Sequence, residues 1–452
     1  MFNFLFKNKV RKYTFSGGIH PKENKHYTEE CPIEKLPLPK IVYIPLSQHT
    51  GKIAKPILKV GDKVKVGQLI GEADGRISAN IHSSISGVVK DLKELPHPLI
   101  FSRVLTYVIE NDGEDIWEEN IKKEFVEKDF SSEEIIEKVH KAGIVGLGGA
   151  AFPTAVKLSP PKEKVIDALI INGCECEPYL TNDYRLMIEK PKEIILGALL
   201  LKKALEKNSK NIRLIFGIED NKEKAIEIFN SYKKEYNFEV YTLKTKYPQG
   251  AEKQLIKAIL KREVPSGGLP FDVGVVVQNV GTAYACYEAC YFDKPLFERV
   301  ITVSGNGIKE KKNLLVRIGT PVKDIVNYCG GYVGEIKKII FGGPIMGVAI
   351  YSEDMPIVKG TTGILFFNER DVLLEKEKDC IRCGRCVEAC PMGLLPCELH
   401  KFIKKREFDK ARDYSLLDCI ECGSCAFACP AKIKLVQSFK FGKQEIWKKE
   451  KK

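Results

Sequence analysis

The chain has 452 residues, which is enough for about three domains of average size. Its 44% hydrophobic fraction excludes disorder over most of the chain, because such a composition buries enough apolar surface to offset the entropy lost on ordering. No run of about 18 uninterrupted apolar residues is present, so the chain is not expected to span a bilayer. The net charge of +12 is compatible with an anionic partner or surface, but no nucleic-acid motif accompanies it, and we expect no nucleic-acid partner.

A small all-β unit is predicted first. Short β runs broken by Gly and Gly-Asp turns occupy residues 37–110. This unit resembles a biotinyl/lipoyl-type barrel-sandwich hybrid. Arg76 stands where that family carries its acylated lysine, and an arginine cannot form the amide. We therefore expect a docking or structural module that is not acylated.

A glycine-rich loop opens a predicted α/β domain. Residues 131–134 have the pattern of a helix capping box, and the helix ends at Gly143. In the loop over residues 146–157, three glycines would let backbone N–H groups approach an anion, and Lys157 would add a positive charge. The loop has neither the Walker lysine nor the dinucleotide fingerprint, so taken alone it is most simply a tight structural turn.

Strand-like and helical runs alternate after this loop. Strands are expected over 165–171, 212–217 and 273–278, and helices over 190–206, 221–234 and 251–262. Such alternation predicts an α/β fold, in which ligands usually bind at the carboxyl ends of the strands.

Eight of the fifteen cysteines form two copies of one motif near the C-terminus. Each copy reads Cys-x2-Cys-x2-Cys-x3-Cys-Pro, over residues 380–391 and 419–430. This is the spacing of bacterial two-cluster ferredoxins, in which the fourth cysteine of each copy reaches the other copy's cluster. Zinc sites use separated cysteine pairs and fit the pattern less well. We predict two [4Fe–4S] clusters, one held by Cys380, Cys383, Cys386 and Cys429, the other by Cys419, Cys422, Cys425 and Cys390. Cys397 belongs to neither set.

Four segments of the α/β domain resemble the flavoprotein subunit of respiratory NADH dehydrogenase. They are the glycine-rich loop, residues 172–178 with the following Asp183, residues 250–252 and residues 278–282. The resemblance implies that FMN is held by Gly146, Gly148, Gly149, Lys157, Asn172, Asn279 and Thr282. It implies that the NADH face is formed by Phe152, Glu175, Glu177 and Glu252, and it adds Asp183 and Gly250 to the cofactor-binding set. For each acidic residue, a solvated or helix-capping carboxylate is the alternative.

The chain departs from that family at three positions. Leu147 replaces an arginine, Cys174 an aspartate and Ala251 the first glutamate of a pair. These departures affect the nicotinamide contacts more than the flavin pocket. Cys174 and Cys176 are expected to be buried packing residues on one face of a strand, and not ligands.

The order of modules resembles the C subunit of the Rnf-type electron-transport complex over nearly the whole chain. It begins with the Phe-Ser-Gly-Gly-Ile-His-Pro motif of residues 15–21, and strands near 300–304 and 314–318 with a helix over 322–328 resemble a β-grasp (SLBB-like) module. The predicted fold class is thus multidomain α/β and α+β. The expected modules are an N-terminal extension (1–36), the barrel-sandwich hybrid (37–110), a Rossmann-like FMN/NADH domain (120–295), the β-grasp domain (296–350), the two-cluster ferredoxin-like domain (370–440) and a basic tail (441–452).

This resemblance implies an enzyme component that exchanges electrons between NAD(H) and ferredoxin through FMN and two [4Fe–4S] clusters. NAD(H) gives or takes two electrons and each cluster one, so FMN must lie between them. The implied partners are membrane-integral and iron–sulfur subunits that transport a cation, with this chain peripheral on the cytoplasmic face of the inner membrane. The alternatives are a soluble flavin/iron–sulfur cobalamin reductase and a non-catalytic assembly adaptor. The first residues, with Phe2, Phe4, Leu5 and Phe6, are either solvated or in contact with an anionic membrane surface.

Overall fold

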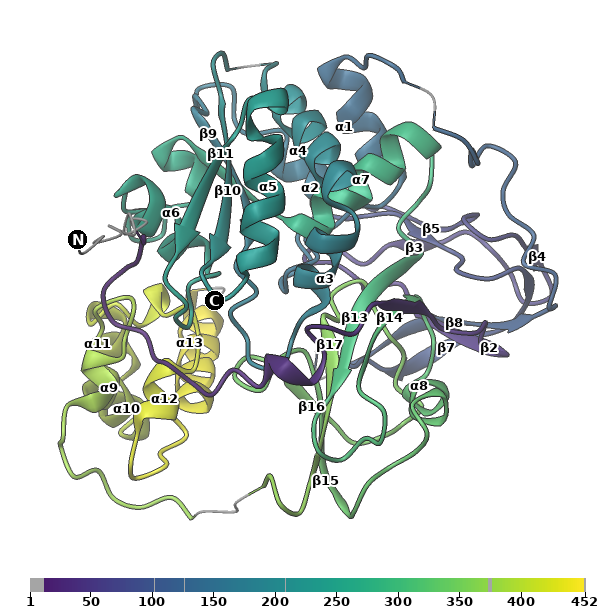
Figure 1. Cartoon of the computed structure of the whole chain (residues 1–452). Coiled ribbons are helices and arrows are strands. Elements are labelled where there is room, and N and C mark those ends of the chain that lie inside the picture. Colours follow the sequence, from purple (N-terminus) through teal and green to yellow (C-terminus); the bar gives the residue numbers. More distant parts are fainter. Residues whose placement is uncertain (1–11, 101, 126, 208, 373–375, 451–452) are drawn as a thin grey trace, which may run out of the picture.

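Apart from the first strand, β1, four groups of elements follow one another along the chain, as Figure 1 shows. The structure is a computed structural model that describes residues 12–450 except 101, 126, 208 and 373–375. The mixture of β and α/β modules confirms the predicted fold class. Within these described ranges, no helix is both long and apolar enough to cross a bilayer. The phenylalanines near the N-terminus lie outside the described residues.

The first module consists of two small antiparallel sheets. One has the strand order β2-β8-β7-β4 and the other β3-β5-β6. Inward-facing aliphatic side chains from both sheets form one core that includes Ile44, Ile81 and Ile109. Arg76 is exposed at a turn between β5 and β6. The strands are β2 (Ile41–Pro45), β3 (Lys55–Pro56), β4 (Lys63–Val64), β5 (Leu69–Glu72), β6 (Ile81–His82), β7 (Gly87–Pro96) and β8 (Arg103–Asn111).

The second module is a parallel four-stranded sheet with helices on both faces. Its strand order is β11-β10-β9-β12. The strands are β9 (Ala168–Gly173), β10 (Arg213–Glu219), β11 (Glu239–Leu243) and β12 (Val275–Asn279). The helices are α1 (Ser132–Lys141), α2 (Thr154–Lys157), α3 (Asn182–Glu189), α4 (Pro191–Leu205), α5 (Glu223–Tyr236), α6 (Glu252–Leu260) and α7 (Val280–Phe292), with a 3-10 turn at Pro270–Val273. The predicted strands and helices are confirmed, with shifts of a few residues at their ends.

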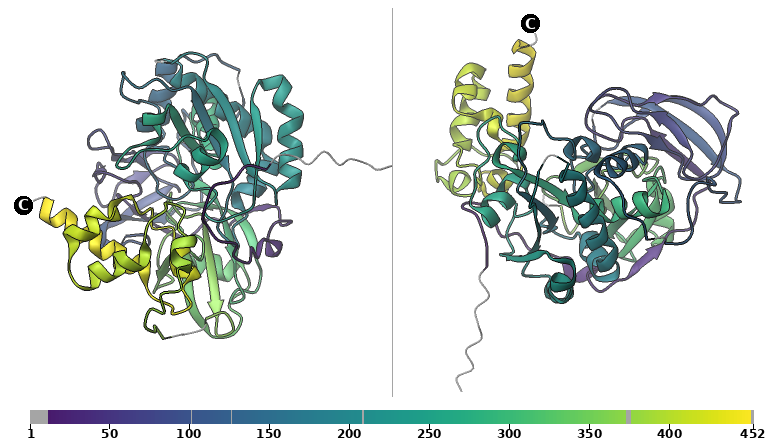
Figure 2. Two further views of the ribbon diagram at one scale, coloured as in Figure 1. Left: turned by 90° about the vertical axis from the view of Figure 1, so that its left-hand side faces the viewer. Right: turned by 90° about the horizontal axis from the view of Figure 1, so that it is seen from above.

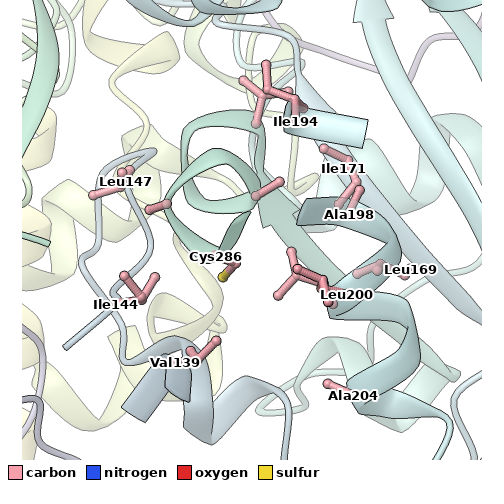
Figure 3. Close-up of a cluster of buried hydrophobic side chains, with 14 of the residues drawn as sticks. Val139, Ile144, Leu147, Leu169, Ile171, Ile194, Ala198, Leu200, Ala204 and Cys286 are labelled. Atoms are coloured by element: carbon pink, nitrogen blue, oxygen red, sulfur yellow. The ribbon is translucent and has the colours of Figure 1, made fainter. Parts of the chain in front are cut away.

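Alternation along the central strand places helices on both faces of this sheet. Leu169 and Ile171 of β9 pack toward α1, α4 and α7, whereas Ala168 and Ile170 pack toward α6. Figure 3 shows the larger core, where the side chains of α4 and α7 meet those of the sheet. Helix α1 begins with the predicted capping box, because Ser131 and Glu134 each accept a hydrogen bond from the other's backbone N–H. This core fixes the positions at which the strands end.

The third module is a six-stranded mixed sheet with the order β1-β14-β13-β17-β15-β16. Two of its strands lie outside the range predicted for the β-grasp domain. Strand β1 comes from the N-terminal extension and pairs in parallel with β14, and β17 lies in the centre of the sheet. The elements are β1 (Ile33–Lys35), β13 (Glu298–Ser304), β14 (Lys312–Arg317), α8 (Val322–Tyr328), β15 (Ile336–Phe341), β16 (Val348–Ile350) and β17 (Gly363–Asn368).

The fourth module is helical and contains both cysteine motifs. Its helices pack around Leu399, Leu416 and Phe439. The barrel-sandwich module and this helical module lie at opposite ends of the molecule, with the parallel sheet between them (Figure 2). The helices are α9 (Arg385–Glu388), α10 (Pro396–Lys404), α11 (Phe408–Asp413), α12 (Ser424–Ala428) and α13 (Leu435–Glu450), with 3-10 turns at Leu416–Asp418 and, in the N-terminal segment, at Lys25–Tyr27.

Candidate cofactor sites

The glycine-rich loop lies beside the N-terminus of α7, next to the carboxyl end of β12. The backbone N–H of Leu147 donates a 3.0 Å hydrogen bond to the hydroxyl of Thr282. A Cβ atom at Gly148 would lie 3.3 Å from the amide nitrogen of Asn279, so the loop backbone runs close to this side chain. The Asn279 amide oxygen in turn accepts hydrogen bonds from the backbone at Gly281 and Thr282 and caps α7. The structure therefore brings together the loop, Asn279 and Thr282, as predicted from distant parts of the sequence.

The loop leaves space on one side for a ligand to approach its backbone. Gly149 has a φ of +144°, and the Cβ that any other residue would add there meets no described atom within 4 Å. At Gly146 the nearest atom to such a Cβ would be 3.7 Å away. The buried hydroxyl of Thr154, at the start of α2, has no hydrogen-bond partner among the described residues. Exposed backbone and an unsatisfied buried donor are features that fit an anionic or polar group such as FMN phosphate.

Two other modules hold this loop in place. From the barrel-sandwich module, Thr50 donates from its hydroxyl to the oxygen of Ala150 at 2.7 Å and from its N–H to that of Ala151 at 3.1 Å. From the β-grasp module, Arg299 donates to the oxygen of Leu147 at 3.2 Å. Sequence reasoning did not identify these contacts, because each joins residues that are remote in sequence and carries no motif.

Lys359 is a second buried cation behind the loop. Its ammonium group donates to the oxygens of Asn80 and Gly143, each at 2.7 Å, and its side chain is fully buried. Burial lowers the pKa of Lys359 to about 7, since desolvation penalises the charged form. Lys359 thus links Asn80 of the barrel-sandwich module to the residue that ends the turn after α1, just before the loop.

Lys157 and Asn172 mark the far side of the predicted pocket. Lys157 pairs with Glu252 at 2.7 Å and also donates to the oxygen of Val277. Asn172, at the carboxyl end of β9, donates to the oxygen of Gly250 at 2.8 Å. The structure therefore brings together four predicted residues from three separate segments. Phe152 lies in the glycine-rich loop and is half-buried.

Asp183 and Glu175 form a buried acidic pair next to Asn279. Asp183 accepts a 2.6 Å hydrogen bond from the Asn279 amide, and its backbone N–H donates to the Glu175 carboxylate at 2.7 Å. Burial and the nearby Glu175 carboxylate raise the pKa of Asp183 to about 7. A cavity of about 70 Å³, lined partly by Asp183 and Arg299, lies beside this pair.

Glu177 lies away from the glycine-rich loop, at a junction of modules. Its carboxylate accepts hydrogen bonds from the backbone of Ile345 and Met346 in the β-grasp module, at 3.1 and 2.9 Å. The hydroxyl of Tyr247 donates to it at 3.3 Å. Burial raises the pKa of Glu177. These contacts make Glu177 a link between the parallel sheet and the β15–β16 turn.

Cys174 and Cys176 follow β9 and do not lie on it, which corrects the expectation that they share one face of a strand. Strand β9 ends at Gly173, and Glu175 between them has a φ of +45°. Cys174 consequently packs in the core beneath α6, whereas Cys176 accepts a hydrogen bond from the N–H of Gly250.

Four cysteines line a cavity in the helical module. They are Cys390, Cys419, Cys422 and Cys425, the set predicted from spacing to hold one cluster. Thiolates are the ligands that iron–sulfur clusters use. Of the other predicted set, Cys380 and Cys383 are exposed, Cys386 is half-buried and Cys429 is buried. Within the described residues, no three metal-ligating side chains converge as closely as a single metal ion requires.

The cavity-lining set faces the parallel-sheet module. The hydroxyl of Tyr247 donates to the oxygen of Cys422 at 2.7 Å. The Gln254 amide donates to the oxygen of Pro391 at 3.3 Å and approaches the sulfur of Met392 at 3.1 Å. Both contacts come from segments that follow the carboxyl end of β11. The predicted flavin domain is therefore in direct contact with the two-cluster module, on the side of one predicted cluster.

Four family models match consecutive parts of the chain. They are described as the RnfC barrel sandwich hybrid domain (residues 13–114), the Nuo51 FMN-binding domain (139–288), the SLBB domain (300–349) and the 4Fe-4S dicluster domain (379–433). FMN and two [4Fe–4S] clusters are therefore the cofactors of this chain, which agrees with the sequence prediction.

Curated relatives match along almost the whole chain. The C subunit of the proton-translocating ferredoxin:NAD(+) oxidoreductase complex of Clostridium ljungdahlii is 50% identical over 96% of this chain and 94% of its own length. The corresponding subunit of the Na(+)-translocating complex of Acetobacterium woodii is 44% identical over 97% and 98%. That of the ion-translocating oxidoreductase complex of Rhodobacter capsulatus is 44% identical over 97% and 84%. At these identities and coverages, the chain belongs to the family of C subunits of the Rnf-type ion-translocating oxidoreductase complexes.

Proposed function

We propose that this chain is the NAD(H)-facing peripheral subunit of a membrane-bound Rnf-type complex. It passes electrons between NAD(H), FMN and two [4Fe–4S] clusters, toward or from ferredoxin. The observation that carries the proposal is the contact of Tyr247 with both Glu177 and the oxygen of Cys422, at 3.3 and 2.7 Å. This contact supports a relay because it joins the segment after β11 of the flavin domain to a cysteine of the adjacent cluster set.

FMN, when bound, supplies the ability to exchange two electrons with a nicotinamide and one at a time with a cluster. The chain's own residues would position the flavin. Gly146, Gly148 and Gly149 present backbone to the ligand, while Asn279 and Thr282 fix the loop against α7. Lys157, held by Glu252, places a positive charge at the pocket's far side.

The two cysteine sets differ in exposure, which suggests their roles. Cys422 and Cys425 are buried, and the oxygen of Cys422 contacts Tyr247 of the flavin domain, whereas Cys380 and Cys383 are exposed. We assign the flavin-proximal cluster to Cys390, Cys419, Cys422 and Cys425. The second set, with Cys386 and Cys429, then faces the partner that receives or delivers single electrons. Exposed ligands suit exchange with another protein.

The partners in this proposal are membrane-integral and iron–sulfur subunits of the same complex, and the chain sits on the cytoplasmic face of the inner membrane. The names of two relatives specify different ions, protons in one and Na⁺ in the other. We therefore assign the cation pathway to the partner subunits. Ferredoxin exchanges electrons with this chain indirectly.

Rapid anaerobic mixing of the purified holoprotein with NADH tests the proposal. We expect the flavin absorbance to bleach first and the broad cluster absorbance to bleach after it. A flavin that NADH does not bleach would favour the assembly adaptor. Purification as a free soluble protein, without membrane subunits, would favour the cobalamin reductase.

A further inference from the structure

The Phe-Ser-Gly-Gly-Ile-His-Pro motif lies within an N-terminal strap, residues 12–21, which runs between the parallel-sheet module and the cluster module. Figure 1 shows this segment as the dark purple trace that passes from the side of α6 toward α12. Its start is fixed to the edge of the sheet, because the N–H of Tyr13 donates to the oxygen of Thr242 and the oxygen of Tyr13 accepts from Lys244. None of the roles assigned above requires this motif.

The two glycines of the strap contact a different module on each side. The N–H of Gly18 donates to the oxygen of Ala389 at 3.0 Å, at the end of the first cysteine motif. A Cβ at Gly17 would lie 2.5 Å from the oxygen of Cys390, and a Cβ at Gly18 would lie 2.6 Å from the oxygen of Tyr247. Their φ values are +74° and +82°, which L side chains rarely adopt. Only glycine allows the strap to fit between the two backbones.

The next residue completes the junction. Ile19 exchanges two backbone hydrogen bonds with Tyr247, at 2.8 and 2.9 Å. Its buried side chain packs in one apolar cluster with Tyr247, Ala389 and Cys422. Tyr247 is also the residue whose hydroxyl reaches the oxygen of Cys422. The strap thus touches both cysteine motifs, at Cys390 directly and at Cys422 through Tyr247.

We propose that Gly17 and Gly18 are positioning residues for electron transfer between FMN and the cluster of Cys390, Cys419, Cys422 and Cys425. The strap sets how closely the cluster module seats against the flavin domain, and the glycines set the thickness of the strap. This inference rests on the proposed function, which supplies FMN as the electron donor. The rate of electron tunnelling falls steeply with the distance between two cofactors, so a shift of the cluster module away from the flavin domain should slow this step.

The test uses Gly17→Ala and Gly18→Ala in the full-length holoprotein, with Gly113→Ala as the matched control. Gly113 has a φ of +84°, and a Cβ there meets no described atom within 4 Å, so it carries the same backbone strain without the contact. Flavin, iron and sulfide per chain are measured first. The methyl group added by Gly18→Ala would meet no cysteine ligand. This variant alone is therefore used if the Gly17→Ala protein contains too few clusters.

Flavin reduction and cluster reduction are then timed separately by anaerobic stopped-flow absorbance. We expect wild-type rates of flavin reduction by NADH in both strap variants and a flavin-to-cluster step that is slowed at least severalfold. Gly113→Ala should match wild type in both steps. An unchanged flavin-to-cluster rate in a strap variant with full cofactor content would overturn the proposal.

Two further measurements separate this inference from the proposed function. Photoreduction of the flavin bypasses NADH, so electron transfer to the clusters is timed even if NADH does not react. Backbone hydrogen exchange over residues 385–391 and 419–425 reports the seating of the cluster module without any electron transfer. Faster exchange there in both strap variants, and not in Gly113→Ala, supports the positioning role, whereas unchanged exchange contradicts it.

Discussion

The ammonium group of Lys359 lies 2.7 Å from the carbonyl oxygen of Gly143, where the backbone enters the glycine-rich loop. The same group lies 2.7 Å from the oxygen of Asn80 in the barrel-sandwich module. One buried cation from the segment before β17 therefore ties two other modules together beneath the flavin loop. The surroundings of the loop are consequently built from three parts of the chain, and its stability depends on all of them.

Replacement of Lys359 by methionine should destabilise the protein by about 1–3 kcal/mol near neutral pH, because the oxygens of Asn80 and Gly143 lose their donor. The folded-state pKa of about 7 lies below the ordinary 10.5, so the unfolded chain binds more protons between these values. The stability of the wild type relative to Lys359→Met should therefore increase as pH rises from about 7. Thermal unfolding midpoints measured across a pH series check this. A difference that is constant with pH would contradict it.

Asp183 should give the stability of the wild type a pH dependence opposite in sign to that given by Lys359, and Asp183→Asn should remove it. The folded-state pKa of Asp183 is raised to about 7 from 3.8, so the folded protein binds more protons between these values. Stability contributed by the protonated carboxyl should be lost as pH rises from about 4 to 7. Asparagine carries no such charge, so the stability of Asp183→Asn relative to the wild type should increase over this pH interval. Thermal unfolding at several pH values below neutrality measures the effect, and parallel curves for the two proteins would count against it.

Gly149→Ala should weaken FMN binding by about tenfold or more, which corresponds to about 1.4 kcal/mol. The added methyl would occupy the open side of the loop, and the φ of +144° is unfavourable for alanine. Iron and sulfide per chain should stay unchanged, because the cysteine motifs are in another module. Fluorescence titration of flavin-depleted protein with FMN measures the affinity, and Gly113→Ala is the control for a positive φ alone. Equal affinity in both variants would mean that the ligand does not approach Gly149.

Cys390→Ala and Cys397→Ala should differ sharply although the two positions are close in sequence. Cys390 lines the cavity with Cys419, Cys422 and Cys425, whereas Cys397 does not. We expect Cys390→Ala to lose one cluster, or about four irons per chain, and Cys397→Ala to keep both. Iron and sulfide analysis with electron paramagnetic resonance of the reduced protein would show this. Full iron content in Cys390→Ala would refute the ligand set.

The α/β domain could be predicted well because the information that specifies it is local. The capping box at Ser131 and the alternation of strands and helices need only neighbouring residues to be recognised. The gathering of Asn172, Asn279 and Lys157 was predicted through resemblance, since they come from separate segments. The contacts of Lys359 with Asn80 and Gly143 were missed, because a buried cation bound to carbonyl oxygens leaves no pattern in sequence.

The placement of Glu177 shows a second limit. Its neighbour Glu175 lies beside Asp183, but Glu177 instead binds backbone N–H groups of the β15–β16 turn. The left-handed backbone at Glu175 reverses the chain between them, and neither residue type signals that turn. Side-chain direction after a strand depends on such local reversals.

Strand β1 has a consequence for biosynthesis. Glu34 pairs with Lys312, from which it is separated by 278 residues. As the polypeptide emerges from the ribosome, the segment that carries β1 must therefore wait until more than half of the chain has been made. Strand β1 can pair with β14 only then, and the nascent protein should remain sensitive to proteases near its beginning until synthesis has passed β14.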